Sequence, residues 1–254
     1  GIACEELSVP LIRENTIRDN SGRQGGGIFC WDRAYPLIER NEITGNVARS
    51  GGAVAVDQAI RCDDSSEDGR AGPLFLEANV LCANTGGGVV VKSGDGVCLM
   101  GNCLFRNDGP GIDLNADGVT ENDSGDSDSG PNGLQNFPML TSAARKGAGI
   151  TVTGALHGAA DRKFALEFFC VHAPDPCGHG EGGEPLGRAT VRTDSAGWAD
   201  FRVSLPSGIN IPWFVTATGP GHSTSEFSAP VWVGPADLAS SPAGVASARP
   251  CGNP

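Results

Sequence analysis

The chain has 254 residues, a formal net charge of −12, 38 glycines, nine cysteines and few aromatic residues. This charge argues against a nucleic-acid partner, whose phosphates need a cationic surface, and against adhesion to an anionic membrane. No apolar run is long enough to cross a bilayer, so the sequence predicts no membrane span. The glycine-rich composition favours many short strands joined by turns.

A repeat runs through the first half of the chain. In each copy a glycine-rich corner leads into a short apolar run, and two asparagine positions recur with spacings of 26, 38 and 23 residues. The two series are Asn15, Asn41, Asn79 and Asn102, and Asn20, Asn46, Asn84 and Asn107. Such a period predicts a β-solenoid whose coils stack about 4.8 Å apart. Asparagine side chains at repeated corners are expected to hydrogen-bond along the stack.

These repeats resemble the right-handed parallel β-helices of the pectate-lyase-like superfamily, over residues 1–115 and about five coils. Residues 111–233, from "GIDLNADGVTENDSGDSDSG" through "EFFC" and "WADF" to "SEFSAP", resemble large secreted bacterial proteins. In those proteins a β-helix precedes an immunoglobulin-like module. The resemblance implies a secreted or cell-surface bacterial protein. Because the chain opens inside the first repeat, at "GIACEEL", we interpret it as a fragment of a longer protein.

The second half carries a different pattern. From Phe137 on, six or seven runs of alternating apolar and polar residues are separated by Gly/Pro-rich turns, as in a β-sandwich. The predicted fold is therefore all-β, a right-handed parallel β-helix followed by an immunoglobulin-like β-sandwich. The predicted boundaries are a β-helix at 1–115, an acidic junction at 116–136, a sandwich at 137–233 and a flexible tail at 234–254.

The acidic junction is the clearest candidate metal site. Residues 111–130 hold six carboxylates and no basic residue, and "DLNADG" matches the opening of a calcium loop, D-x-[DN]-x-[DN]-G. Ser124 stands where an EF-hand has its last glutamate, so the motif is not an EF-hand. The predicted calcium ligands are Asp113, Asn115, Asp117, Glu121 and Asp123, with Asp126 and Asp128 following. The interpretation is a structural calcium joint; a solvated acidic linker and a catalytic centre are the alternatives.

A second candidate site lies on the lateral face of the β-helix. Aligning the coils places Glu5, Trp31, Asp57 and Lys92 in one row. Trp31 is predicted to stack on a sugar ring, with Asp32 and Arg33 beside it as binding residues. For elimination or hydrolysis, Asp57 and Asp63 would hold calcium or act as acid and base. Lys92 or Arg61 would abstract the proton next to a uronate carboxylate.

The cysteines predict one local disulfide. Cys170 and Cys177 end a strand and a turn and are close enough to pair. Cys4 and Cys30 occupy the same position in neighbouring coils and are expected to be stacked thiols, because parallel side chains do not suit disulfide geometry.

Three functions fit the sequence. The first is a calcium-stabilised module that contacts polysaccharide or another cell-surface polymer without catalysis. The second is a polysaccharide lyase or glycoside hydrolase acting on the lateral face of the β-helix. The third is a structural spacer of a larger surface protein.

Overall fold

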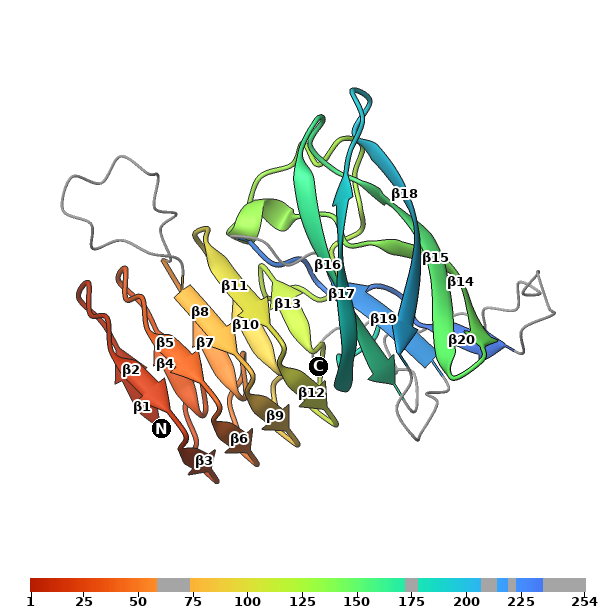
Figure 1. Ribbon diagram of the computed structural model, residues 1–254. Helices are drawn as coiled ribbons and strands as arrows, with labels where there is room; N and C mark the ends of the chain where they lie inside the picture. The colour runs from red at the N-terminus through yellow and green to blue at the C-terminus, as the bar shows by residue number, and fades with distance from the viewer. Residues whose placement is uncertain (59–73, 172–177, 207–213, 219–222, 235–254) are drawn as a thin grey trace.

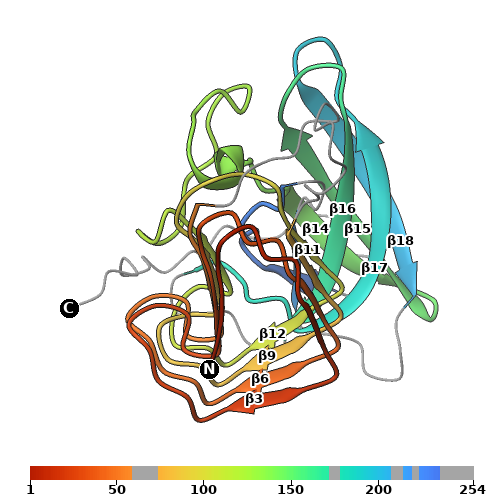
Figure 2. The ribbon, with the colours of Figure 1, turned by 90° about the vertical axis from the view of Figure 1, so that its left-hand side faces the viewer.

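The computed structural model describes residues 1–58, 74–171, 178–206, 214–218 and 223–234. In the first half, short strands stack in parallel into three sheets around one apolar core (Figure 1). Seen from the N-terminal end, successive coils lie over one another as loops (Figure 2). The first half is therefore a parallel β-helix, and the described residues are all-β apart from one short 3-10 turn, η1 (Pro131–Leu134).

We name the sheets of the β-helix A, B and C. Sheet A holds, in stacking order, β1 (Ile2–Cys4), β4 (Ile28–Cys30), β7 (Val54–Val56), β10 (Val89–Val91) and β13 (Ile112–Leu114). Sheet B holds β2 (Leu11–Arg13), β5 (Leu37–Glu39), β8 (Leu74–Glu77) and β11 (Val97–Met100). Sheet C holds β3 (Thr16–Arg18), β6 (Glu42–Thr44), β9 (Val80–Cys82) and β12 (Cys103–Phe105).

The register of sheet A agrees with the alignment of the sequence repeats. The chain of paired residues runs from Ile2 to Ile28, Val54, Val89 and Ile112. Their side chains belong to one core cluster or pack against it. Because neighbouring residues of a strand point to opposite faces, a slip of one residue would turn this apolar row outward. The buried row therefore fixes the register.

Both asparagine series form hydrogen-bonded ladders, as the sequence predicts. Oδ1 of Asn41 accepts from the backbone N and from Nδ2 of Asn15, at 2.9 and 3.1 Å. Oδ1 of Asn79 accepts from the same two atoms of Asn41, at 2.9 and 3.0 Å. Nδ2 of Asn41 also donates to the Ile12 carbonyl at 2.8 Å. Each buried asparagine thus satisfies backbone groups at a corner where the strand ladder is interrupted.

The second half is one continuous seven-stranded sheet that folds back on itself (Figure 1). Its strands are β14 (Met139–Lys146), β15 (Gly149–His157), β16 (Lys163–Val171), β17 (Glu184–Arg192), β18 (Trp198–Pro206), β19 (Phe214–Thr218) and β20 (Val231–Gly234). They pair in the order β17-β16-β19-β20-β14-β15-β18, antiparallel except for β14 with β20. Phe168 of β16 meets Phe201 of β18 edge-on, with ring centroids 5.9 Å apart. The two ends of the sheet therefore pack face to face.

The second half also closes the C-terminal end of the β-helix, which the sequence did not predict. Phe169 and Phe227 belong to the same apolar cluster as the β-helix core. The Thr224 amide donates to the Val97 carbonyl at 3.0 Å, as a strand of a further coil would. An uncovered last coil would expose both its apolar interior and its unpaired backbone groups. Residues 223–228 and the neighbouring strands cover the apolar interior of the last coil and pair with its backbone groups.

Glutamate side chains complete this cap. Glu226 is buried, and its Oε1 and Oε2 accept from the amides of Leu114 and Thr120 at 2.7 and 2.9 Å. Burial, with added repulsion from Asp113 and Asp117, raises the pKa of Glu226 to about 8 even though these two amides oppose the shift. Glu167 and Glu181 likewise accept from the amides of Gly101 and Asn107.

Candidate functional site

The row predicted on the β-helix face is present on the outer side of sheet A. The amides of Trp31, Asp57 and Lys92 donate to carbonyls one coil below, at 3.0, 2.8 and 2.8 Å. Each of the three follows the last residue of its strand in sheet A, so the three side chains share one outward-facing row. Glu5 holds the same position in the first coil.

Trp31 is held in a defined orientation while remaining 40% exposed. Its Nε1 donates to Glu5 Oε2 at 3.0 Å. Its ring lies parallel to that of Phe29, with centroids 6.4 Å apart and an interplanar angle of 6°. An indole fixed on two sides and open on another offers a flat apolar surface to a ligand without a large ordering cost.

The ionic groups of the row contact one another. Lys92 Nζ lies 3.7 Å from Asp57 Oδ2, and the Ser93 hydroxyl donates to Asp57 Oδ1 at 2.6 Å. The Gln58 amide in turn donates to Ser93 Oγ at 2.7 Å. Both oxygens of Asp57 are thus engaged. Asp57 and Lys92 therefore contact each other, and Asp57 also contacts Ser93. Neither is available as an acid or base without breaking one of these contacts.

The corner next to Trp31 has an unusual backbone. Asp32 and Arg33 have φ angles of 48° and 60°, a left-handed conformation that is uncommon outside glycine and asparagine. Their side chains form an ion pair, with Arg33 Nε 3.7 Å from Asp32 Oδ1. The two other predicted catalytic residues, Asp63 and Arg61, lie outside the described residues.

The predicted calcium loop does not gather its ligands around one point. Asp113 is buried on β13, and its Oδ1 accepts from the Gly118 amide at 3.3 Å. Burial raises the pKa of Asp113 to about 6. Asn115 Nδ2 donates to Asp117 Oδ2 at 2.8 Å, so these two side chains pair with one another. Glu121 is exposed.

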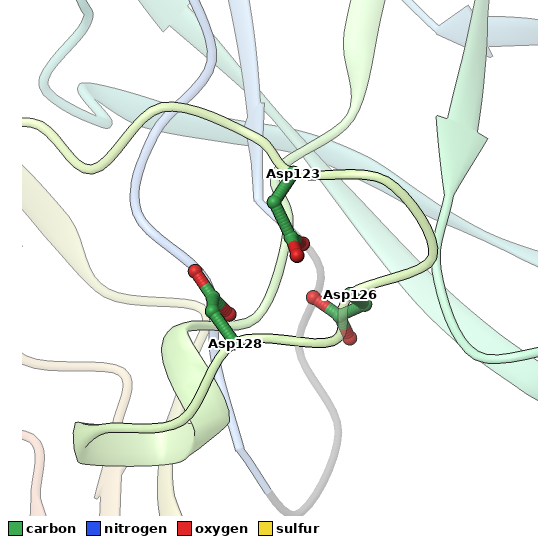
Figure 3. Close-up of side chains that lie close together, drawn as sticks. All are labelled: Asp123, Asp126 and Asp128. Carbon is green, nitrogen blue, oxygen red and sulfur yellow. The ribbon is translucent and has the colours of Figure 1, made fainter.

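Asp123 instead meets the two aspartates that follow it. In the part of the chain that the structure describes, Asp123, Asp126 and Asp128 form the one group of three or more potential metal ligands whose oxygens lie within 4.8 Å of one another. Figure 3 shows the three carboxylates turned toward a common space. In the sequence these aspartates belong to "DSGDSD", residues 123–128. The calcium-loop pattern that begins at Asp113 lies just before them, and the ligand prediction is based on that pattern.

The surroundings of these three carboxylates differ. Ser127 donates its hydroxyl to Asp123 Oδ2 at 2.7 Å and its amide to both oxygens, which lowers the pKa of Asp123. Asp126 Oδ1 accepts from the Asn136 amide at 2.6 Å. Asp128 Oδ1 is shielded from solvent and has no hydrogen-bond partner among the described residues. Burial raises the pKa of both Asp126 and Asp128, and the neighbouring carboxylates add to it. A bound cation would relieve this repulsion and fill the vacant coordination of Asp128.

Four of the six cysteines that the structure describes are buried. Cys4 and Cys30 are paired in register on sheet A and are free thiols, as predicted. A hydrogen bond between them lowers the pKa of Cys4 and raises that of Cys30 well above its usual value. Cys170 is buried on β16, and its predicted disulfide partner, Cys177, lies outside the described residues.

Comparison with known proteins supports the fold of the first half. Residues 1–123 match the family model described as the right handed beta helix region. No curated protein matches the chain. Among the described residues, no helix has the length and apolar character needed to cross a membrane. Together with the parallel stacking of sheets A, B and C, the match makes the first half of the chain a right-handed parallel β-helix.

Proposed function

We propose that the chain is a non-catalytic module of a secreted or cell-surface bacterial protein that contacts polysaccharide along the outward row of Glu5, Trp31, Asp57 and Lys92 at the ends of the sheet A strands. The observation that carries the proposal is Trp31, exposed in that row and held flat by Glu5 and Phe29. Sugar rings present apolar C–H faces that pack on aromatic rings, and their hydroxyl groups donate to carboxylates. We also propose that residues 1–115 are related to the pectate-lyase-like superfamily. Residues 137–233 are, in the same proposal, an immunoglobulin-like module.

The contacts of the row favour binding over catalysis. A lyase or glycoside hydrolase would use Asp57, Asp63, Lys92 or Arg61 as acid, base or calcium ligand. Asp57 is engaged by Lys92 and Ser93, so catalysis would first have to break these contacts. The enzyme remains the second candidate, tested by release of reducing ends or unsaturated products from a panel of neutral and acidic polysaccharides. A spacer role predicts neither products nor retention on any polymer.

We propose calcium as a structural cofactor at the junction of the two halves. Asp123, Asp126 and Asp128 supply carboxylate oxygens, which are the ligands that calcium prefers, and Asp128 has an oxygen without a partner among the described residues. The loop is tied to the second half, because Asn136 Nδ2 donates to the carbonyls of Asp123 and His157, both at about 2.9 Å or less. Binding there would stiffen the connection between β13 and β14.

Retention of the purified chain on insoluble polysaccharides tests the contact. We expect Trp31→Ala to abolish retention, because the substitution removes the exposed ring and leaves the core of the β-helix intact. The matched control is Trp198→Ala, since Trp198 is similarly exposed, at 44%, but lies on β18 in the second half. Equal loss of retention in both variants, or retention that Trp31→Ala leaves unchanged, would reject sheet A as the contact face.

A further inference from the structure

The charges around Trp31 indicate which polysaccharides suit this face. We infer that the row of Glu5, Trp31, Asp57 and Lys92 at the ends of the sheet A strands takes an uncharged polysaccharide and excludes polyuronates. The inference rests on the proposed polysaccharide contact and adds to it the class of ligand. It is drawn from the pairing of the ionic groups beside Trp31, from their net charge and from the shape of the aromatic surface.

Two described cations, Arg33 at the corner next to Trp31 and Lys92 in the row, each lie beside an aspartate. Lys92 Nζ lies 3.7 Å from Asp57 Oδ2, and Arg33 Nε lies 3.7 Å from Asp32 Oδ1. A uronate carboxylate gains affinity where it meets an unpaired arginine or lysine. Here each cation is already offset by a neighbouring aspartate, so a uronate would gain less than it would from an unpaired cation. The described residues of this face therefore offer a uronate no cation without a carboxylate beside it.

Carboxylates also outnumber cations along this face. The Leu7 amide donates to the Asp32 carbonyl at 3.2 Å, which stacks the first corner on the second and brings Glu6 beside Asp32. Among the described residues, the row and its first two corners hold Glu5, Glu6, Asp32 and Asp57 against Arg33 and Lys92, so four negative and two positive charges leave a charge of −2 there. A polymer with a carboxylate on each sugar would meet like charge along its length, within the roughly 8 Å over which charges interact at physiological salt.

An uncharged sugar polymer fits the same groups well. The exposed side of the Trp31 ring, supported by Phe29, accepts the apolar face of a sugar. Coil spacing puts Asp57 and Lys92 about 5 and 10 Å from Trp31 along the row, so a chain running across the coils would present hydroxyl groups to each in turn. Carboxylates accept hydrogen bonds from hydroxyls without needing a countercharge from the ligand. Shape and charge thus select the same ligand class.

Batch retention of the full chain tests the inference with two sets of probes. The uncharged probes are cellulose, insoluble β-1,3-glucan and xylan freed of side chains, and the acidic probes are calcium-gelled pectate and alginate. We expect retention on at least one uncharged probe, little change between low and high sodium chloride, and loss of that retention in Trp31→Ala. We expect no retention on pectate or alginate. A matched charge control is Glu42→Gln, which removes one negative charge from the exposed side of β6 in sheet C, away from Trp31.

The possible outcomes distinguish failure of the inferred ligand class from failure of the proposed polysaccharide contact. Glu42→Gln should keep retention on the uncharged probe within about twofold, because Glu42 lies on sheet C and not in the row with Trp31. Stronger retention on pectate or alginate than on every uncharged probe, lost in Trp31→Ala, would overturn the ligand class while keeping the contact face. Retention on none of the probes would overturn both the ligand class and the proposed polysaccharide contact. Because Trp31 lies outside the core, we expect the variants to remain folded. Their melting curves check that a loss of retention does not come from unfolding.

Discussion

Oε1 of Glu181 accepts hydrogen bonds from both the backbone N and Nδ2 of Asn107, at 3.0 and 2.7 Å. Within the β-helix, Oδ1 of Asn107 accepts from the same two atoms of Asn84, at 3.1 and 2.9 Å. The glutamate of the second half thus takes the place that the asparagine of a further coil would occupy. It ends the ladder without leaving the last asparagine's donors unpaired.

This replacement predicts a difference between two substitutions of Glu181. Glu181→Ala removes the acceptor of two donors of Asn107, which is itself 7% exposed, and should lower the free energy of unfolding by about 1–3 kcal/mol. Glu181→Gln keeps an acceptor of the same reach and should cost less than about 1 kcal/mol. Urea denaturation of both variants measures the difference. Equal losses would show that the charge, and not the ladder bond, stabilises the cap.

The ladder itself predicts a gradient from its buried middle to its exposed end. Asn79→Ala removes four hydrogen bonds, to Asn41 N, Asn41 Nδ2, Ile38 O and Asn102 Oδ1, at a position only 1% exposed. We expect a loss of about 3 kcal/mol or more, since buried donors are left without acceptors.

The exposed end of the ladder provides the comparison. In Asn15→Ala the backbone amide still donates to Asn41 Oδ1, so the loss should stay below about 1 kcal/mol. Both values come from the same urea titrations. A cost for Asn15→Ala that matches that of Asn79→Ala would mean that the ladder stabilises the coil through something other than buried hydrogen bonds.

The ladders were predictable because repetition is visible in the sequence. The spacings between Asn15, Asn41, Asn79 and Asn102 are also the separations across which their side chains bond. The row with Trp31 followed from the same alignment. The cap did not follow, because Glu181 is a single residue, about 74 positions from Asn107, with no neighbouring copy to reveal its role.

The proposed metal ligands show a different limit of sequence analysis. The calcium-loop pattern assumes that residues spaced by two turn toward one ion. Asp113 lies on a strand and faces outward from sheet A, where the strand geometry, and not the loop pattern, sets its direction. Asp123, Asp126 and Asp128 converge because Asn136 and His157 hold the loop from the other side of the junction. Such long-range contacts leave no local pattern.

The buried carboxyl of Glu226 predicts a stability that falls as pH rises. Its pKa is about 8 in the folded state against an ordinary value of 4.5, so between these values the folded chain holds a proton that the unfolded chain has lost. Folding then takes up a proton, and stability decreases with pH by up to about 1.4 kcal/mol per unit. Melting temperatures measured from pH 4.5 to 8 in the presence of a chelator should decline accordingly.

Two variants show which carboxyl group causes this decline in stability. Glu226→Gln cannot titrate and should flatten the curve between about pH 6 and 8. Asp113→Asn should flatten it only below about pH 6, where the raised pKa of Asp113 acts with the same sign. A slope between pH 6 and 8 that persists in Glu226→Gln would show that another group titrates there.

Calcium binding predicts a melting temperature that depends on a chelator and on particular aspartates. With calcium at a hundredfold excess over its dissociation constant, the free energy of unfolding should rise by about 2.7 kcal/mol. Asp126→Asn keeps the acceptor for the Asn136 amide but removes a charge, and should abolish the calcium-dependent increase. Asp117→Asn should retain the increase, because Asp117 pairs with Asn115 outside the group of three. The opposite result would indicate that calcium binds at the loop that begins at Asp113. If the chelator does not change the melting temperature of the unaltered chain, a stabilising calcium ion is excluded.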